Sequence, residues 1–261
     1  MNATDAAFVV DAVSVEYPNA PALQDVSVRI NRGEAVAFVG PSGSGKTTLL
    51  RLLNGSVRPT RGIVRVEGSP LGEMTAKELR RTRASIGFVH QDLRLVPNLR
   101  VQQNVIAGRF GRLSFSASLR AMLLTPNRLT REVHEVLERV GIAEKLFERT
   151  ERLSGGQQQR VAIARALFQQ PVALLADEPV SSVDPARARD SVQLLTGLSR
   201  ELGMTLCVSL HHLELAREFF PRLIGLKRGH IIFDQSASAL SNEQFDALYR
   251  LEAAELVGDA S

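Results

Sequence analysis

The chain has 261 residues, of which 44% are hydrophobic and 23% are charged, the ordinary balance of a globular protein rather than a disordered or fibrous one. Lysine and arginine outnumber aspartate and glutamate by 32 to 28, and a formal net charge of +4 is too small to identify a nucleic-acid or membrane partner. With Cys207 as the single cysteine, an intrachain disulfide is excluded and zinc held by thiolates is not expected. No apolar run reaches the roughly 18 residues of a membrane span, and Asp5 stands where a signal peptide would carry positive charge. The composition therefore predicts a soluble, intracellular protein.

The predicted strands change character along the chain. Residues 8–17, 26–30 and 63–66 favour strands in which apolar and polar side chains alternate. From Glu34 onward, short apolar runs alternate with helical stretches, which is typical of a parallel sheet with crossover helices. The strands expected in this second part are 36–39, 86–89, 172–176 and 206–210.

Two amphipathic helices are expected between the second and third of these strands. Apolar residues at helical spacing predict one helix over 115–123, ended by Pro126, and another over 133–140 with Gly141 as its C-terminal cap. Near the end of the chain, apolar runs at 223–226 and 231–233 flank a hairpin-like turn. We expect an α/β fold with a mostly parallel sheet, a β-rich antiparallel N-terminal portion and a helical insertion over about 92–170.

A phosphate-binding loop is predicted at residues 40–47. The sequence Gly-Pro-Ser-Gly-Ser-Gly-Lys-Thr fits G-x-x-x-x-G-K-[ST] between an expected strand and an expected helix. In such a loop, backbone N–H groups converge on a phosphate and the helix adds its positive N-terminal end. Lys46 is expected to reach the β- and γ-phosphates of a nucleotide, and the Thr47 hydroxyl to ligate Mg²⁺. The alternative, a glycine-rich turn without a ligand, does not explain this strand–loop–helix context.

Two adjacent carboxylates follow the buried run at 172–176. Asp177 is placed to act on the Mg²⁺, and Glu178 to orient or deprotonate an attacking water. Without the phosphate-binding loop, a simple charge pair at a strand end would explain them equally well. With the loop, hydrolysis of the nucleotide is favoured over transfer of phosphate to another substrate.

A second anion-binding segment is predicted at residues 153–157, Leu-Ser-Gly-Gly-Gln, followed by QQRVAIARAL. Serine and two glycines at a helix start leave N–H groups free for an anion, although the segment can also be an ordinary helix cap. With this segment the sequence resembles the ATP-binding cassette (ABC) family, from about Phe8 to Lys227. The resemblance implies a head-to-tail homodimer in which each ATP lies between one phosphate-binding loop and the other subunit's segment from Ser154 to Gln157.

The resemblance also implies roles for single residues. Tyr17 stands at the position that stacks on adenine, Gln91 at the glutamine that ligates Mg²⁺ or the lytic water, and His211 at the histidine that contacts the γ-phosphate. His212 leaves a one-residue ambiguity for the last. Asp184 matches a loop that communicates across the dimer, although Val183 replaces the family's usual alanine. The implied nucleotide-binding residues are Tyr17, Gly40, Pro41, Ser42, Gly43, Ser44, Gly45, Lys46, Thr47, Thr48, Ser154, Gly155, Gly156, Gln157 and Asp184; the implied metal ligands are Thr47, Gln91 and Asp177; the implied catalytic residues are Glu178, His211 and Gln91.

A finer resemblance is to the ATP-binding subunits of phosphonate importers. It is carried by Gln169-Gln170, by Leu210-His211-His212 and by Phe245-Asp246-Ala-Leu-Tyr249-Arg250. It implies import of a phosphonate or related phosphorus oxyanion, with ATP and Mg²⁺ as cofactors. ABC ATPases of lipoprotein extraction, cell division or DNA repair, and more remotely a small-molecule kinase, are the alternatives. No nucleic-acid partner is expected, because nothing between Lys46 and Asp177 sustains coiled-coil heptads.

The resemblance further implies integral membrane partner subunits, an indirect substrate-binding protein, and peripheral attachment to the cytoplasmic face of the membrane. Residues 108–131 carry five arginines and no acidic residue, which suits an anionic membrane surface or a partner. The equal alternative is a solvated polar face over a packed stripe from Phe115 to Leu123. We expect a single ABC ATPase domain over 1–261, with a core and β-subdomain at 1–91 and 171–261 and a helical subdomain at 92–170.

Overall fold

The structure, a computed structural model, describes residues 5–18, 20–179 and 185–249. Its strands are β1 (Ala6–Tyr17), β2 (Ala20–Asn31), β3 (Ala35–Val39), β4 (Arg61–Val66), β5 (Ser69–Pro70), β6 (Ile86–Val89), β7 (Ala173–Asp177), β8 (Thr205–Leu210), β9 (Arg222–Lys227) and β10 (His230–Ser236). Its α-helices are α1 (Lys46–Leu53), α2 (Ala76–Ala84), α3 (Val101–Ile106), α4 (Phe115–Leu123), α5 (Asn127–Arg139), α6 (Gly155–Phe168), α7 (Pro185–Leu202), α8 (Leu213–Phe219) and α9 (Asn242–Tyr249). Short 3₁₀ turns are η2 (Leu71–Glu73), η3 (Ala107–Arg112), η4 (Ala143–Lys145) and η5 (Thr150–Arg152).

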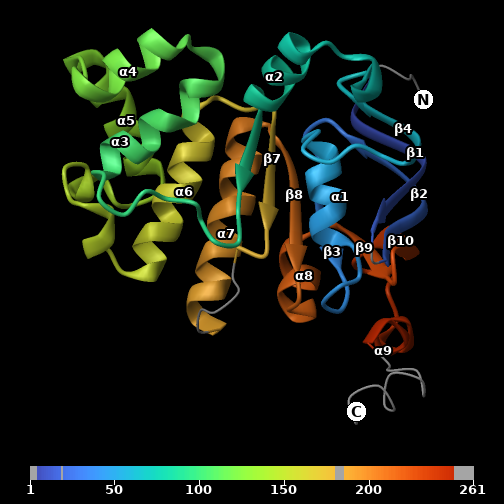
Figure 1. Ribbon diagram of the computed structural model, residues 1–261. Coiled ribbons are helices and arrows are strands. Elements are labelled where there is room, and N and C mark those ends of the chain that lie inside the picture. The colour runs from blue at the N-terminus through green and yellow to red at the C-terminus, as the bar shows by residue number, and fades with distance from the viewer. Residues whose placement is uncertain (1–4, 19, 180–184, 250–261) are drawn as a thin grey trace, which may run out of the picture.

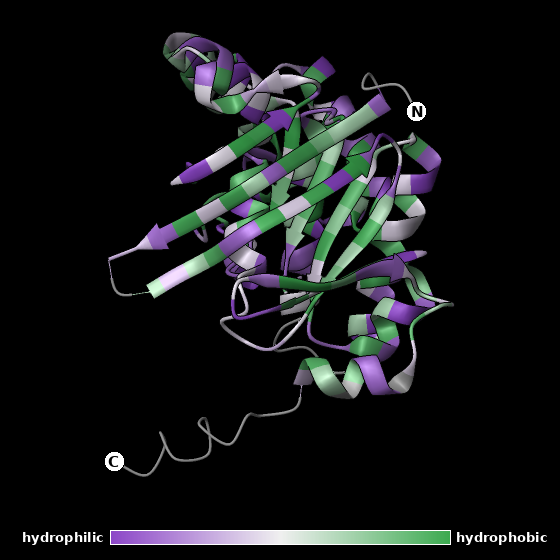
Figure 2. Cartoon of the chain, turned by 90° about the vertical axis from the view of Figure 1, so that its right-hand side faces the viewer, coloured by the Kyte–Doolittle hydropathy of each residue, from purple (hydrophilic) through white to green (hydrophobic). Residues whose placement is uncertain are grey.

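The strands form two sheets, which confirms the predicted fold class. One is antiparallel with the order β2-β1-β4-β5, and its long strands alternate hydrophobic and hydrophilic residues (Figure 2). The other has the order β10-β9-β3-β8-β7-β6, and all its neighbouring strands are parallel except the β9–β10 hairpin. β7 and β8 are buried along their whole length, as expected of central parallel strands covered on both faces.

The six-stranded sheet separates two hydrophobic cores, and β3 contributes to both. Val36 and Phe38 join the core between this sheet and the antiparallel one, where helix α1 packs. Ala37 and Val39 point the other way, into the core formed with α3, α5, α6 and α7. Helices α1 and α6 therefore cover opposite faces of the sheet (Figure 1). The alternation of side chains along a strand explains this arrangement.

Most predicted strand boundaries lie within one or two residues of the structure, but β2 and α5 each begin six residues before the predicted segments 26–30 and 133–140. The strand expected at 86–89 is β6 as predicted, whereas β7 begins and ends one residue later than expected. The cap at Gly141 is also confirmed. Its φ of 70° and its hydrogen bond from N to Glu138 O, at 2.9 Å, end helix α5 in the way that favours glycine. The division into a core and a helical subdomain at 92–170 stays a prediction.

Helix α4 has the predicted bounds, but the apolar stripe from Phe115 to Leu123, which we expected to be packed if the arginines form only a solvated face, is exposed at Phe115 and Leu119. The Phe115 side chain is 85% exposed and that of Leu119 is 48% exposed. Since α4 contacts mainly η3 and α3, most of one face of the helix stays in solvent. The packed stripe is therefore wrong at these two residues.

Two arginines of the acid-free segment 108–131 stabilise the fold. Arg109 lies 3.8 Å from the centre of the Phe168 ring, pairs with Glu132 and donates to the Phe168 carbonyl. Arg112 donates to the carbonyl of Ala84. Their cationic groups are thus engaged within the chain, which weakens the argument from charge for a membrane or partner surface. Across the described ranges, no helix combines the length and the apolar character needed to cross a bilayer.

Candidate nucleotide-hydrolysis site

The loop between β3 and α1 has the backbone that its glycines predict. Gly40, Gly43 and Gly45 have φ values of 151°, 75° and 107°. A Cβ added to Gly40 would lie 2.1 Å from the Leu226 carbonyl oxygen, so only glycine fits there. Ser44 is buried, and its hydroxyl has no hydrogen-bond partner among the described residues. Such an orphaned polar atom inside the loop is consistent with a polar ligand.

Lys46 begins helix α1 and folds back over the loop. Its Nζ donates to the carbonyls of Gly40 and Pro41, at 2.9 Å each, and lies 3.8 Å from Glu178 Oε1. Burial lowers the pKa of Lys46, while the nearby carboxylates of Glu178 and Asp177 oppose that shift. A cation that is 3% exposed yet lies close to anions is well placed to exchange carbonyl partners for phosphate oxygens.

Asp177 ends β7 and accepts two hydrogen bonds on one oxygen. Thr47 Oγ1 donates to Asp177 Oδ1 at 2.9 Å, and Ser209 Oγ on the neighbouring strand β8 donates to the same atom at 2.9 Å. The Ser209 hydroxyl also accepts from the backbone N–H of Glu178, at 2.7 Å. The register that pairs Asp177 with Ser209 makes this network possible. Sequence reasoning missed Ser209, because nothing in the local pattern at 205–210 indicates which strand pairs with β7.

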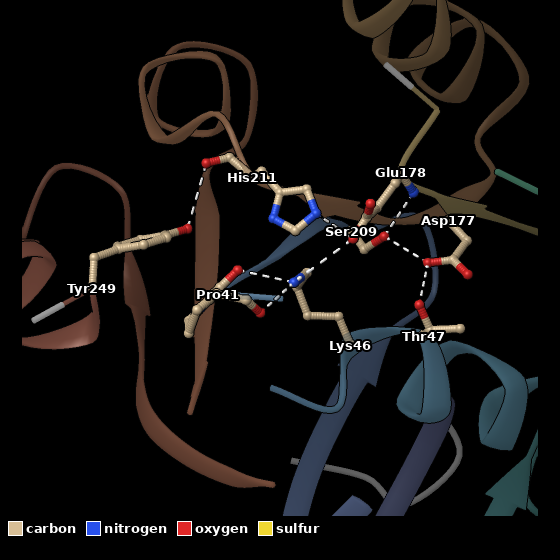
Figure 3. A network of polar contacts seen from close by, with 9 residues as sticks. Pro41, Lys46, Thr47, Asp177, Glu178, Ser209, His211 and Tyr249 are labelled. Atoms are coloured by element: carbon tan, nitrogen blue, oxygen red, sulfur yellow. Dashed lines mark hydrogen bonds and ion pairs between the residues drawn. The ribbon is translucent and has the colours of Figure 1, made fainter. Parts of the chain in front are cut away.

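Glu178 lies one residue beyond β7, with a φ of 45° that is unusual for a residue other than glycine. Its Oε1 contacts His211 Nε2, and Figure 3 shows both side chains pointing toward Lys46. The Glu178 side chain is 14% exposed. The structure thus brings together the residues predicted to hold a γ-phosphate and to activate water, from the ends of β3, β7 and β8.

Gln91 follows β6, the strand next to β7, and is exposed. His90 before it stacks on Phe88, with ring centroids 4.3 Å apart. Burial lowers the pKa of His90 to about 4, with a further contribution from the charge of Arg94. Gln91 therefore stands on the same sheet edge as Asp177, beside an imidazole that stays neutral near pH 7.

The segment at 154–157 is the N-terminus of α6. Ser154 caps the helix, with Gln157 N donating to Ser154 Oγ at 3.4 Å and Ser154 N donating to Gln157 Oε1 at 3.0 Å. A Cβ on Gly155 or Gly156 would meet nothing within 4 Å. These glycines are therefore not required by the packing of their own chain. The ordinary helix cap is thus present, anion binding at this helix end stays a prediction, and α6 lies across the sheet from helix α1.

Gln159, which the sequence analysis did not single out, ties α6 to the hydrolytic strand. Its side chain is 3% exposed, its amide donates to the carbonyl of Pro179, and its Oε1 accepts from Ser191 Oγ at 3.1 Å. Pro179 follows Glu178 directly. The sequence offered one indication of this role, because Gln159 is a polar residue two positions after Gln157 on the buried face of α6.

Tyr17 is not among the residues that make these contacts. Tyr17 is 45% exposed at the end of β1, where it pairs with Ala20 across a turn. Its partly exposed ring is available for stacking. Asp184 lies outside the described residues.

The oxygen donors at the loop fit Mg²⁺. The Thr47 hydroxyl and the Asp177 carboxylate are hard ligands held 2.9 Å apart. Within the described ranges, no group of three or more His, Cys, Asp or Glu side chains could hold a metal ion by itself. An ion here would therefore take its other ligands from phosphate oxygens and water, which is how Mg²⁺ commonly binds with nucleotides.

A phosphate-binding loop beside a strand-borne Asp-Glu pair, at the carboxyl edge of a parallel sheet, defines a P-loop nucleotide hydrolase. The sequence model described as ABC transporter matches residues 23–181, more than half of the chain. The chain belongs to the ABC transporter ATP-binding family, and it is an ABC-type ATPase.

Relatives with known names resemble the chain over most of its length. Phosphonates import ATP-binding protein PhnC of Anaeromyxobacter dehalogenans is 48% identical over 89% of this chain, which spans only 46% of that longer protein. PhnC 3 of Halalkalibacterium halodurans is 42% identical over 94% of this chain and 96% of its own. Among solved structures, a dimeric ATP-binding cassette in a post-hydrolysis state, bound to ADP and Pi, has a TM-score of 0.72 and 32% identity, covering 89% of this chain and 100% of the other.

Proposed function

We propose that this chain is the ATP-hydrolysing subunit of an importer for phosphonates or closely related phosphorus oxyanions. The observation that carries the substrate class is the name shared by relatives 42% and 48% identical to this chain. The site contributes the chemistry of hydrolysis and nothing about the cargo. Cargo recognition belongs to separate membrane subunits and a substrate-binding protein on the far side of the membrane, with the ATPase attached peripherally to the cytoplasmic face.

The proposed binding step exchanges partners around Lys46. Its Nζ leaves the carbonyls of Gly40 and Pro41 and takes the β- and γ-phosphate oxygens, while the loop N–H groups and the N-terminus of α1 hold the remaining oxygens. Tyr17 stacks on the adenine. Thr47, Asp177 and Gln91 would hold Mg²⁺, which would neutralise phosphate charge.

The proposed hydrolytic step uses the pair of Glu178 and His211. Glu178 accepts a proton from the attacking water, whose oxygen bonds to the γ-phosphorus while the bond from that phosphorus to the β–γ bridging oxygen breaks and ADP leaves. His211, in contact with Glu178 Oε1, orients the carboxylate and faces the γ-phosphate. Ser154, Gly155, Gly156 and Gln157 of a second copy supply N–H groups to the same phosphate. Asp184 links the two sites across the dimer. That both glycines face free space in one chain supports this use of a second copy.

The substrate class is tested by uptake in cells that lack the chromosomal gene. Cells carrying wild-type protein, Glu178→Gln or Glu201→Gln receive a labelled phosphonate and, in parallel, labelled phosphate. Glu201 pairs with Arg139 on the surface and controls for an acid-to-amide change away from the site. We expect Glu178→Gln alone to abolish phosphonate uptake while phosphate uptake continues. Phosphonate uptake that survives Glu178→Gln, although the purified variant no longer hydrolyses ATP, would remove the substrate assignment.

The ATPase role is tested separately on purified protein. Glu178→Gln should lower kcat by about 100-fold or more, because general-base catalysis contributes that much. Glu201→Gln should keep the wild-type rate. Hydrolysis by Glu178→Gln at the wild-type rate would show that another group activates the water.

A further inference from the structure

The C-terminal helix α9 is fixed firmly against the core. Leu248 is fully buried and Phe245 nearly so. The Phe245 ring meets the Phe233 ring edge to face, with centroids 6.2 Å apart, and the Arg217 guanidinium lies 5.1 Å from its centre. Lys227 Nζ at the end of β9 donates to the Ala247 carbonyl at 3.0 Å. The last described residue of the helix is therefore held in a defined place.

That residue, Tyr249, reaches into the hydrolytic site from outside the sheet. Its hydroxyl donates to the carbonyl oxygen of His211 at 3.4 Å, 38 residues away in the chain (Figure 3). Burial raises the pKa of the Tyr249 phenol, and a hydrogen bond with the backbone of Gly40 opposes that rise. The hydroxyl thus donates a hydrogen bond to the main chain of one predicted site residue, His211.

His211 and Gly40, the first residue of the phosphate-binding loop, follow directly on paired strands. The parallel ladder between β3 and β8 ends at Val39 and Leu210. Gly40 and His211 are the next residues, where one chain turns into the phosphate-binding loop and the other leaves toward α8. The Tyr249 hydroxyl stands where these two backbones separate, and no further ladder pair joins them.

We propose that Tyr249 is a positioning residue for ATP hydrolysis, which holds the backbone of His211 so that its imidazole meets Glu178. This inference rests on the proposed roles of His211 and Glu178. The His211 ring is one-third exposed, so side-chain packing alone does not fix it. Its backbone carbonyl, tied to a rigid helix, supplies the missing constraint. The C-terminal helix thereby becomes part of the machinery that orients the γ-phosphate histidine.

The test removes the hydroxyl and keeps the ring. Tyr249→Phe should lower the kcat for ATP hydrolysis about fivefold, the size expected when a single hydrogen bond is lost. The KM for ATP should change less than about twofold, because Lys46 and Thr47 keep all their hydrogen-bond partners. The control is Gln235→Ala, which cuts the 2.9 Å hydrogen bond from β10 to Gln244 of α9 without approaching His211. It should keep the wild-type kcat.

A double-mutant cycle separates positioning from general stability. In a His211→Ala background, followed by single-turnover hydrolysis of labelled ATP, Tyr249→Phe should have almost no further effect. An equal fivefold loss in both backgrounds, or a wild-type kcat for Tyr249→Phe alone, would overturn the inference. Thermal unfolding of each variant shows whether the fold is intact. The His211 imidazole signals in NMR should move in Tyr249→Phe and stay in place in Gln235→Ala; unmoved signals in both would also overturn it.

The two proposals can fail separately. If Glu178→Gln is inactive while Tyr249→Phe behaves like wild type, the proposed role of Glu178 is supported and the proposed role of Tyr249 is refuted. If Glu178→Gln hydrolyses ATP normally, the proposed chemistry of the site falls first.

Discussion

The hydrogen bonds of Ser209 give a prediction whose size follows from the geometry. The Ser209 hydroxyl is fully buried, donates to Asp177 Oδ1 at 2.9 Å and accepts from Glu178 N at 2.7 Å. Ser209→Ala removes a hydrogen bond to a carboxylate, worth about 1.5–3 kcal/mol, and leaves a buried N–H without its partner, at a cost of about 1–3 kcal/mol. Allowing for relaxation, we expect the free energy of unfolding to fall by about 3 kcal/mol.

A second buried serine provides the matched control. Ser199 is 3% exposed, and its hydroxyl donates to the Met204 carbonyl at 2.7 Å. This bond joins two neutral groups, so Ser199→Ala should cost about 1 kcal/mol. The two variants delete the same atom from equally buried sites. Their difference of about 2 kcal/mol isolates the carboxylate and the Glu178 N–H.

Urea denaturation of the purified chain without nucleotide measures both variants, and ATPase assays follow them. Ser209→Ala should also hydrolyse ATP more slowly, because Ser209 holds the backbone of Glu178 at its positive φ. If Ser209→Ala is no more destabilising than Ser199→Ala, the network around Asp177 does not contribute as its geometry indicates. A normal ATPase rate in a destabilised Ser209→Ala would show that Glu178 is held by other contacts.

Three further predictions concern other parts of the fold. Because the pKa of His90 is lowered from 6.5 to about 4 in the folded chain, the native state binds fewer protons than the unfolded state between these pH values, and its stability should fall as the pH drops from 6.5 to 4. In His90→Gln, the free energy of unfolding measured in urea should fall by about 1–2 kcal/mol less over this pH range, after a discount for partial exposure. The same pH dependence in both proteins would contradict the assignment. Gln159→Ala should lower the free energy of unfolding by about 2 kcal/mol and slow ATP hydrolysis. Ser191→Ala removes only one of the two hydrogen bonds of Gln159 and should lower the free energy of unfolding less. Equal losses of stability in urea would show that the hydrogen bond to Pro179 adds nothing. Phe115→Ser should change the midpoint of thermal unfolding very little, because Phe115 is 85% exposed. Leu137→Ala, at a fully buried position, should lower the free energy of unfolding by about 2–5 kcal/mol. A large drop in the midpoint for Phe115→Ser would mean that α4 packs more tightly than its exposure indicates.

The sequence predicts best where one short segment determines both structure and chemistry. Residues 40–47 combine a turn that requires glycine with the lysine and threonine that a phosphate and Mg²⁺ require, so the motif predicts the loop and its position together. The buried run before Asp177 similarly predicts a central strand, because only a strand covered on both faces is apolar throughout.

The contacts that the sequence did not predict join segments far apart in the chain. Ser209 reaches Asp177 because β8 pairs with β7 in one register, and a shift by one residue would turn the hydroxyl to the other face. Tyr249 belongs to a segment interpreted through a family resemblance, and a resemblance does not show that its hydroxyl meets His211. Phe115 shows the opposite error. Helical spacing indicates an apolar face but does not supply a surface that covers it.

The free space around Gly155 and Gly156 distinguishes residues that the chain needs for folding from residues that it needs for contacts with other molecules. A side chain at either position would collide with nothing in its own subunit, so alanine should leave expression level and melting temperature almost unchanged. Gly40 is the reverse case, because a Cβ there would collide with the backbone of Leu226 whatever the protein does. A mutational scan scored by folding would therefore register Gly40 and overlook Gly155 and Gly156. The same scan scored by growth on a transported nutrient would register both, and the difference between the two maps would outline the surface that the chain reserves for other molecules.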